Sequence, residues 1–550
     1  MQKRMVFLAM VILFLTAIAP IFSTLKETDM GTVNAQGSNA LPDVSFPSRF
    51  DTSPRALRDL IDKPLPPRAR AGRDFEPGRP LAIGNSNPKY VDPLAAVGFG
   101  GVSASILPNA ATYGTPVDPN YRVAPPDTTG DLGPSHYVQW VNLRYSIYTV
   151  TRDASGDIAT FNLVNGFPKN GNVLWQGFGG PCETYNDGDP IVQYDQLADR
   201  WVLTQFAVSA RPYTQCVAVS TGPDPTGTYY RYSYSYSNSF NDYPKMSVWP
   251  DGYYITYNMF LYGSLFSGGR VCAFERSKML TGASARQICK STSSSYPSLL
   301  PADLEGSTLP PSGSPNFLLS MTSNSIRFWK YAVNWSTGKA TLTGPTTISG
   351  VAAFTRACNG GTCVPQPETT QQLASLADRL MYRLSYRNFG GGRESLLVNH
   401  SVAANNASGI RWYELSNASG KTMSNATPII RQQGTYAPSP DFRWMGSAAM
   451  DKTGGIAIGY NISNSTSIKP SIRYAYRGPN DALGTLGSEV NILDGTGSQT
   501  ASLARWGDYS TISVDPTNGC TMVFTTEYIP SNGNFNWSTY IYSFKLSTCQ

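Results

Sequence analysis

Three aspartates are placed where carboxylate chemistry could occur, because each stands at the head of an apolar run bounded by turn residues. They are Asp189 in GDPIVQYDQLADRW, Asp242 in NDYPKMSVWPDGYYITYN and Asp508 in GDYSTISVDPTNGCTMVFTTEY, and weaker copies of the pattern begin at Asp131 and Asp441. Cleavage of a glycosidic bond needs two carboxyl groups that face the sugar across a few ångströms. The first three aspartates are therefore predicted to be catalytic or ligand-binding. A short carboxylate in this place can equally accept backbone N–H groups and fix its own turn.

Aromatic and basic side chains accompany these aspartates and are predicted to bind the substrate. Tyr243 and Tyr509 directly follow two of the aspartates, and Arg443 and Arg505 lie in the same group of motifs. A tyrosine combined with an arginine clamp is what a sialidase uses. The SxDxGxTW-type turn box of that superfamily is missing, however, and three arginines at recognisable positions cannot be identified. A sialidase in the strict sense is therefore disfavoured.

The sequence contains two histidines, His136 in PSHYVQW and His400 in VNHSV. A polysaccharide lyase needs a base, usually histidine or tyrosine, and a group that neutralises the uronate. Both histidines are therefore predicted substrate-binding residues, and His400 or a tyrosine would be the base of a lyase. A lone histidine in strand-like sequence is more often a hydrogen-bonded structural residue. Nucleophilic serine chemistry has no support, because no GxSxG elbow occurs.

The YNDGDP loop resembles a loop that could hold calcium, with Asp187 and Asp189 as ligands. An EF-hand frame that starts at Asp187 places Ile191 at position 5 and Ala198 at position 12, where oxygen ligands are required. The EF-hand is therefore excluded. Irregular calcium binding by the two aspartates and backbone carbonyls stays open, and the predicted chemistry requires no cofactor.

Eight cysteines, an even number, favour disulfides in an exported chain. Eight cysteines allow 105 pairings. Pairing of sequence neighbours is the simplest of these: Cys182 with Cys216, Cys272 with Cys289, Cys358 with Cys363, and Cys520 with Cys549. A zinc site is disfavoured, because no CxxC motif occurs and only the two histidines could assist.

The N-terminus has the pattern of an export signal. The apolar run MVFLAMVILFLTAIAPIF follows Lys3 and Arg4, and the small residues of VNA at 33–35 permit cleavage before Gln36. Residues 1–35 are therefore the predicted signal peptide, with an uncleaved anchor as the alternative. No other apolar run approaches the roughly 20 residues of a membrane span. The mature protein is predicted to be secreted, or to lie in the cell envelope, without a transmembrane helix.

Charge and composition limit the partners. The formal net charge is +6 over 550 residues, and charged residues make up 15% of the chain. This charge is too mild and too dispersed to indicate nucleic acid. Residues 36–114 are rich in proline and arginine and predict a linker or a wrapped arm, interrupted by a short helix at 53–62.

Residues 115–550 have the strand-and-turn texture of an all-β domain. The aspartate-led pattern recurs roughly every 50 to 70 residues, which is typical of the four-stranded blades of a β-propeller. Roughly 435 residues at about 62 per blade predict seven blades, six is the close alternative, and a pair of β-sandwiches is the runner-up. Helices are expected only at 275–280 and 368–380.

Several long motifs together resemble a family of exported, largely uncharacterised bacterial proteins. They include GGPCETYNDGDPIVQYDQLADRWVLTQFA, FNDYPKMSVWPDGYYITYN, ADRLMYRLSYRNFG, LLVNHSV, RWMGSAAMD and ARWGDYSTISVDPTNGCTMVFTTEY. The resemblance covers about residues 120–549 and implies a sialidase-like β-propeller organisation. It implies no reaction and no catalytic residue, so function has to be argued from the site.

These observations lead to two classes of function. The first is recognition, with cleavage as a hydrolase, of an extracellular polysaccharide or glycoprotein glycan at the propeller funnel. The second is a non-catalytic adhesion or cell-envelope scaffold protein, in which the same aspartates would be structural. A polysaccharide lyase is a further alternative.

Overall fold

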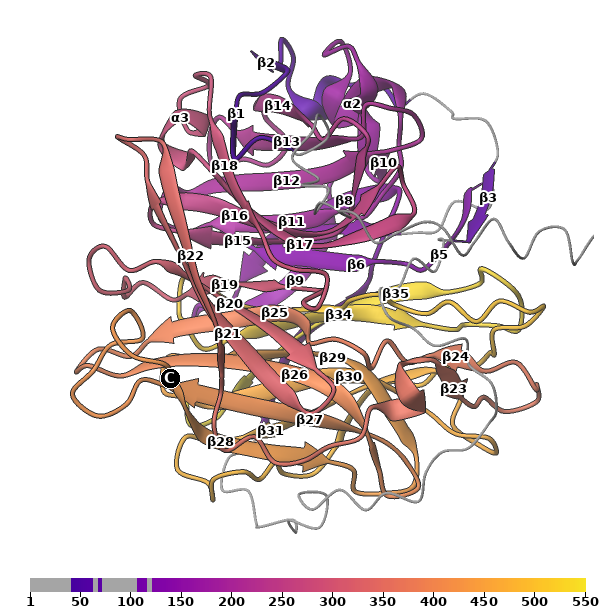
Figure 1. Ribbon diagram of the computed structural model, residues 1–550. Coiled ribbons are helices and arrows are strands. Elements are labelled where there is room, and N and C mark those ends of the chain that lie inside the picture. Colours follow the sequence, from indigo (N-terminus) through magenta and orange to yellow (C-terminus); the bar gives the residue numbers. More distant parts are fainter. Residues whose placement is uncertain (1–40, 63–67, 72–105, 116–120) are drawn as a thin grey trace, which may run out of the picture. The chain divides into compact units, whose positions relative to one another are not determined.

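The computed structural model describes residues 41–62, 68–71, 106–115 and 121–550. The predicted signal peptide and much of the predicted arm lie outside these ranges. Residues 42–550 form one compact unit, and this unit is all-β (Figure 1).

Seven antiparallel units of four strands follow one another in the described part of the chain. The first three are β6 (Thr128–Leu132), β7 (His136–Val141), β8 (Arg144–Arg152) and β9 (Ile158–Leu163); β11 (Ile191–Asp195), β12 (Arg200–Ala207), β13 (Thr214–Ser220) and β14 (Tyr229–Ser235); and β15 (Ser239–Trp249), β16 (Gly252–Leu261), β17 (Leu265–Phe274) and β18 (Gln287–Ser291). The fourth and fifth are β19 (Leu300–Glu305), β20 (Asn316–Thr322), β21 (Ser325–Asn334) and β22 (Lys339–Thr347); and β25 (Met381–Asn388), β26 (Glu394–Ala404), β27 (Ala407–Ser416) and β28 (Ile429–Tyr436). The last two are β29 (Phe442–Met450), β30 (Ile456–Ser463), β31 (Ser471–Arg477) and β32 (Val490–Leu493); and β33 (Thr511–Val514), β34 (Met522–Tyr528), β35 (Ser538–Leu546) and β4 (Ile106–Tyr113).

The first strand of each unit, here called the inner strand, contacts the inner strand of the next unit. The contacts run β6–β11–β15–β19–β25–β29–β33, and β33 also contacts β6, so the series closes on itself. Strands β19 and β25 pair in parallel and join the fourth and fifth units into one sheet. Because the inner strands meet, the turns that precede them are brought together at one end of the ring.

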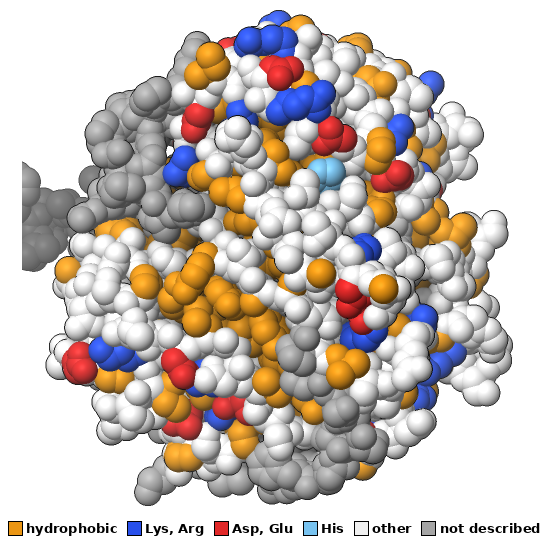
Figure 2. All heavy atoms as spheres, turned by 180° about the vertical axis from the view of Figure 1, so that it is seen from behind, with side chains coloured by type: hydrophobic (Ala, Val, Ile, Leu, Met, Phe, Trp, Pro, Cys, Tyr) orange, Lys and Arg blue, Asp and Glu red, His pale blue; other side chains and the backbone are white. Residues whose placement is uncertain are grey.

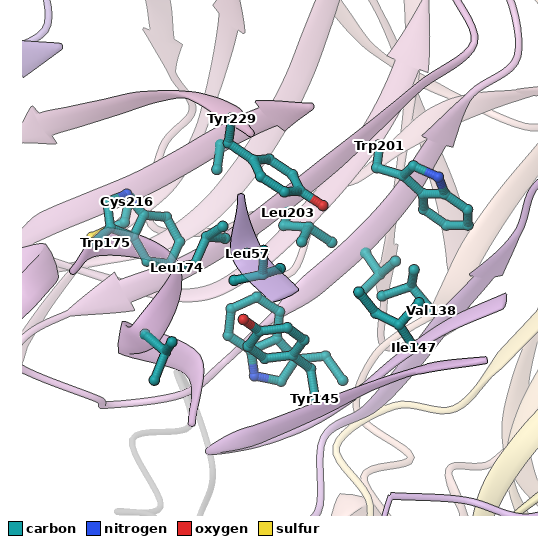
Figure 3. Packing of buried hydrophobic residues seen from close by; sticks show 14 of the residues in the cluster. Leu57, Val138, Tyr145, Ile147, Leu174, Trp175, Trp201, Leu203, Cys216 and Tyr229 are labelled. Carbon is teal, nitrogen blue, oxygen red and sulfur yellow. The ribbon is translucent and has the colours of Figure 1, made fainter. Parts of the chain in front are cut away.

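The N-terminal segment supplies strands to sheets that form much later in the chain. β1 (Val44–Ser45) pairs with β18, β2 (Arg49–Thr52) pairs with β14, and the 3-10 helix η1 (Leu57–Asp59) follows them. Figure 3 shows Leu57 among Leu174, Tyr145 and Tyr229 in a buried cluster formed by the first and second units. Residues 42–62 are thus held by strand pairing and apolar burial. β4 lies within the segment predicted as an arm and completes the last sheet.

The remaining elements are short. They are β3 (Arg68–Ala71), β5 (Tyr121–Ala124), β10 (Lys169–Asn170), β23 (Thr362–Val364), β24 (Leu373–Ala374), the helices α2 (Pro181–Thr184) and α3 (Arg276–Met279), and the 3-10 helices η2 (Gly171–Trp175) and η3 (Ala357–Gly360). The helix expected at 275–280 is confirmed as α3. The helix expected at 368–380 is wrong, because this segment contains β24, which pairs with β23.

Residues 348–380 form an insertion between the fourth and fifth units, and tertiary contacts explain its irregular path. Cys358–Cys363 closes a short loop within the insertion. The N–H of Ala374 donates to the carbonyl of Ala504 at 2.8 Å, and Gln366 exchanges hydrogen bonds with Gln499. These bonds fix the backbone against the loop at 498–504, so they override any local preference for a helix.

All four disulfides expected from neighbour pairing are confirmed: Cys182–Cys216, Cys272–Cys289, Cys358–Cys363 and Cys520–Cys549. In the described ranges, no helix is long and apolar enough to cross a membrane. Figure 2 shows acidic and basic side chains in small mixed groups on one face of the molecule. This mixture agrees with the weak net charge and gives no extended basic surface on that face.

Candidate functional site

A turn of unusual backbone geometry stands near the start of most inner strands. The residue at this position has a positive φ in six units: Asp127 (51°), Asp189 (44°), Tyr243 (53°), Ser298 (52°), Met445 (56°) and Asp508 (83°). Such values are uncommon for residues other than glycine, and aspartate tolerates them better than most. Amide side chains fix some of these turns, since Asn142 donates to Asp127 Oδ2 at 3.1 Å and Asn258 Oδ1 accepts from the Ser298 N–H at 2.7 Å.

The ring brings the three predicted aspartates together and adds a fourth carboxylate. Asp127, Asp189, Asp242 and Asp508 stand at β6, β11, β15 and β33, which are neighbouring inner strands. They are close enough for their charges to interact. Asp189 and Asp242 are half-buried, whereas Asp127 is 1% exposed and Asp508 is 9% exposed. The two half-buried aspartates are therefore the members of the cluster that reach the surface.

Lys245 lies inside this carboxylate cluster. A register irregularity between Asp242 and Lys245 bends β15 at this point. The Lys245 amine donates to the carbonyl of Pro244 at 2.9 Å and lies 3.3 Å from the ring centroid of Tyr243 and 3.9 Å from that of Tyr509. Burial lowers the pKa of Lys245 to about 7, although the nearby aspartates favour its charged form.

Tyr243 and Tyr509 were predicted to bind substrate, and the structure places both in the interior of the site. Tyr243 donates its hydroxyl to the carbonyl of Asp508 at 3.2 Å, and Tyr509 donates to the carbonyl of Pro190 at 2.9 Å. They are 4% and 0% exposed. Both rings therefore brace the turns that carry Asp508 and Asp189, and they offer no open face for a sugar.

Two arginines flank the carboxylates, and both come from irregular segments. Arg505, a predicted residue, donates from Nη2 to both carboxylate oxygens of Asp508 at 2.8 Å. Arg379 comes from the 348–380 insertion, pairs with Asp378 at 2.8 Å and lies 4.6 Å from the ring centroid of Tyr243. The inner strands thus provide the carboxylates, and the loops provide the guanidinium groups.

Two carboxyl groups of the site, those of Asp127 and Asp242, have raised pKa values. Burial raises the pKa of Asp242 well above its ordinary value, and the negative charges of Asp189 and Asp508 add to this effect. Burial and the same two charges also raise the pKa of Asp127. In the part of the chain that the structure describes, the Asp242 carboxyl makes no hydrogen bond or ion pair. A half-buried carboxyl with a raised pKa is suited to donate a proton.

Glu527 on β34 is a further buried acid beside this cluster. It accepts hydrogen bonds from Thr128 at 3.2 Å and Thr526 at 3.1 Å. Burial raises its pKa to about 7, and the charge of Asp508 contributes to the rise. Glu527 is fully buried, so it can influence Asp508 electrostatically without reaching a ligand.

Three other predicted substrate-binding residues lie apart from the cluster. Arg443 pairs with Glu489 at 2.7 Å, and its side chain is 2% exposed. His400 is fully buried against Tyr413, with 3.0 Å between His400 Nε2 and the Tyr413 hydroxyl. Burial and the charge of Arg411 lower the pKa of His400 well below its ordinary value.

His136 begins β7, the strand antiparallel to β6, so it stands at the opposite end of the inner strands from Asp127. Its Nδ1 lies 3.0 Å from the hydroxyl of Ser135. Burial lowers its pKa. The contacts of His136 are therefore those of a structural residue at a strand end.

The predicted calcium ligand Asp187 fixes a turn. Its carboxylate accepts from the N–H groups of Val208 and Ser209 at 2.7 Å and from the Ser209 hydroxyl at 2.5 Å. Over the described ranges, no group of three or more His, Cys, Asp or Glu residues is arranged to hold a metal ion. Asp189 belongs to the carboxylate cluster instead.

The weaker repeat copies were aligned in the wrong register. Asp131 does not lead its strand but lies inside β6, where it pairs with Arg383 at 3.0 Å. The aspartate in the turn before β6 is Asp127, four residues earlier. In the sixth unit Met445, and not Asp441, takes that position.

Lys245 and Arg379 were not predicted from the sequence. Lys245 stands two residues after Tyr243, within the strand-like run YPKMSVW, where a lysine gives no distinctive signal. Arg379 lies in the segment interpreted as a helix. Asp127 could have been found, because DTTGD offers two aspartates four residues apart as the start of the pattern.

No protein family and no curated protein matches this chain. Solved structures match it at low identity. An α-L-arabinanase of Penicillium chrysogenum, complexed with arabinobiose, is 10% identical over 80% of this chain and 98% of its own, with a TM-score of 0.36. An α-L-arabinofuranosidase of Fusarium graminearum with arabinobiose is 7% identical over 80% and 98%, with a TM-score of 0.35. An exo-β-1,3-galactanase of Phanerochaete chrysosporium with β-1,3-galactotriose is 10% identical over 79% and 100%, with a TM-score of 0.30.

At these identities and TM-scores, function has to be derived from the residues of this chain. The resemblance to exported bacterial proteins of sialidase-like organisation stays a prediction.

Proposed function

We propose that the chain is an exported β-propeller of seven blades that binds an extracellular polysaccharide or glycoprotein glycan and hydrolyses a glycosidic bond. Seven consecutive four-stranded units with inner strands in a closed series support the propeller. The observation that carries the proposed activity is the convergence of Asp189, Asp242 and Asp508 at the starts of neighbouring inner strands.

The three carboxyl groups have different surroundings, and we assign each of them a different role accordingly. Asp242 is half-buried and its pKa is raised well above the ordinary value, so it is the general acid that protonates the leaving oxygen. Asp189 is also half-buried and acts as the base or nucleophile. Asp508 is bound by Arg505, and its negative charge helps to raise the pKa of Asp242.

Site-directed variants test these roles. Wild-type protein, Asp242→Asn and Asp189→Asn are incubated with a panel of polysaccharides, and the release of reducing ends is measured. Loss of a positioned acid or base costs roughly 100-fold to 10,000-fold in rate. Asp441→Asn is the matched control, because Asp441 is a half-buried aspartate that directly precedes β29 and lies outside the cluster. Binding without release by the wild type, unchanged in Asp242→Asn, would refute the hydrolase.

A non-catalytic adhesion or scaffold protein is the second candidate. The enclosure of Lys245, Tyr243 and Tyr509 favours it, because a buried, braced cluster also stabilises a propeller centre. In that case all aspartate variants would lose stability, and none would change a reaction rate.

A lyase has less support, since His400 is buried and the hydroxyls of Tyr243 and Tyr509 already donate to carbonyls. Burial raises the pKa of both tyrosines, which opposes a role as base. Calcium binding at Asp187 and Asp189 stays a prediction, and the proposed hydrolysis requires no cofactor. Export agrees with the four disulfides.

A further inference from the structure

A group of partly exposed aromatic and aliphatic side chains lies beside the carboxylate cluster, on the second and third units. Its members are Tyr213, Phe240, Tyr262, Leu265 and Phe266, called the aromatic platform here. Tyr262 is 48% exposed and Leu265 is 63% exposed, and the other three are half-buried. Exposed apolar side chains grouped in this way mark an interaction site more often than scattered ones do.

Aromatic ring contacts connect Tyr213, Phe240 and Phe266 within the platform. The centroids of Tyr213 and Phe240 are 5.5 Å apart, those of Phe240 and Phe260 are 6.1 Å apart, and those of Phe260 and Phe266 are 5.4 Å apart. Phe260 is 2% exposed and forms the buried base of the group. Three members of the platform are thus packed together, and the Arg211 guanidinium lies 5.8 Å from the ring centroid of Tyr213 and 5.9 Å from that of Tyr262.

Hydrogen bonds to backbone carbonyls hold the three turns of the platform in place. The N–H of Tyr213 donates to the carbonyl of Ser237 at 3.0 Å, and the N–H of Tyr262 donates to the carbonyl of Asn238 at 2.8 Å. Arg211 donates to the carbonyl of Tyr262 at 3.0 Å. Because these turns are fixed before a ligand arrives, binding would cost little ordering of the protein.

The platform joins the candidate catalytic site through two residues. Phe240 stands two residues before Asp242 on β15. Phe206, whose ring centroid is 5.8 Å from that of Phe240, donates its N–H to the carbonyl of Gly188 at 3.2 Å, directly beside Asp189. The platform thus begins where the two half-buried aspartates of the cluster reach the surface.

We propose that the aromatic platform binds the sugar units of a polysaccharide that extend from the bond held at Asp242 and Asp189. This inference rests on the proposed function and names its substrate class, a polymer long enough to span both places. Aromatic side chains pack against the C–H faces of sugar rings, while hydroxyls seek polar partners. Arg211 is exposed and lies 5.8 Å from the ring centroid of Tyr213 and 5.9 Å from that of Tyr262. Its N–H groups are suitably placed to donate to those hydroxyls.

A protein partner fits this surface less well. The platform has five side chains, whereas stable protein interfaces use roughly 20 to 30 residues on each side. Its continuity with the carboxylate cluster also favours a ligand that occupies both. A second copy of the chain is retained as an outcome of the test.

The test measures binding and cleavage separately. Affinity gel electrophoresis uses soluble arabinan, galactan, xylan and mixed-linkage glucan with wild type, Tyr262→Ala and Leu265→Ser. Tyr113→Ala is the matched control, because Tyr113 is 67% exposed on β4 of the last sheet. We expect Tyr262→Ala to bind the preferred polysaccharide about tenfold more weakly, with Tyr113→Ala unchanged. Cleavage by Tyr262→Ala should show a raised KM for the polymer and an unchanged kcat.

The outcomes distinguish the platform from the catalytic site. Asp242→Asn should keep polysaccharide binding and lose the release of reducing ends. If Tyr262→Ala and Leu265→Ser bind and cleave as the wild type does, the platform proposal is wrong and the hydrolase stands. If the wild type binds none of the four polysaccharides, the platform proposal fails. A wild-type dimer in sedimentation that Tyr262→Ala abolishes, with glycan binding unchanged, would assign the surface to a second copy.

Discussion

Arg383 on β25 provides a sharp test of how the centre of the ring is held together. Its guanidinium, 3% exposed, lies 3.0 Å from Asp131 on β6 and 2.9 Å from Asp303 on β19, with Glu305 at 3.9 Å. One cation thus joins three units of the ring. Arg383→Met would leave these carboxylates buried without their counter-ion, and breaking a buried pair in this way costs about 3 to 5 kcal/mol.

The penalty should depend on pH in a direction that the charges determine. Burial raises the pKa of Asp303 to about 6 and that of Glu305 to about 8, and loss of Arg383 would raise both further. A carboxyl whose folded pKa exceeds its unfolded value stabilises the fold at low pH and loses that contribution as pH rises through the folded pKa. The cost of Arg383→Met should therefore fall by about 2 kcal/mol from pH 8 to pH 5, which corresponds to a rise of about one and a half pKa units for one carboxyl.

Urea unfolding under non-reducing conditions, followed by tryptophan fluorescence at pH 5 and pH 8, measures this cost. Arg58→Met is the matched control, because Arg58 pairs with Asp224 at 3.0 Å and the two side chains are 52% and 48% exposed. An exposed pair contributes about 0 to 1 kcal/mol. A cost below about 1 kcal/mol for Arg383→Met at pH 8, or a cost that does not change with pH, would refute the reasoning.

Three further predictions concern other parts of the molecule. Glu527→Gln should reduce the loss of stability between pH 5 and pH 8 by up to about 3 kcal/mol, because the pKa of Glu527 is raised from 4.5 to about 7, and urea unfolding across this range checks it. Leu57→Ala should cost about 2 to 5 kcal/mol in unfolding free energy, since Leu57 is 1% exposed, whereas Leu309→Ala, at 50% exposed, should be near neutral. Treatment with EDTA should leave the Tm unchanged if Asp187 only fixes its turn, and a fall in Tm that calcium reverses would show an occupied site.

Local patterns in the sequence were enough to predict the all-β class and the disulfides. The cysteines of each pair are close in sequence and lie in adjacent strands, turns or short helices, so neighbour pairing agrees with the geometry. The sequence pattern also selected Asp189 and Asp508, which stand two and three residues before the inner strands β11 and β33, and Asp242, which lies within β15. Their meeting at one end of the ring follows from the repeat itself.

Other parts of the site depend on contacts that no local pattern encodes. Arg379 reaches Tyr243 because the 348–380 insertion is held against a loop more than 100 residues later, through Ala374 and Ala504. Arg443 and Asp441 have the right residue types beside a repeat motif, but Arg443 turns toward Glu489. Asp127 directly precedes β6 and Asp131 lies within it, and only the position of β6 in the ring decides between them.

The position of β4 imposes an order on the assembly of the fold. β4 (Ile106–Tyr113) pairs with β35 (Ser538–Leu546), so the last sheet cannot be completed until β35 has been synthesised. The disulfides instead join cysteines only 5, 17, 29 and 34 residues apart. Oxidation can therefore fasten local parts of the chain early, while closure of the ring waits for β35. A chain interrupted before β35 would contain oxidised sheets and a permanently open edge.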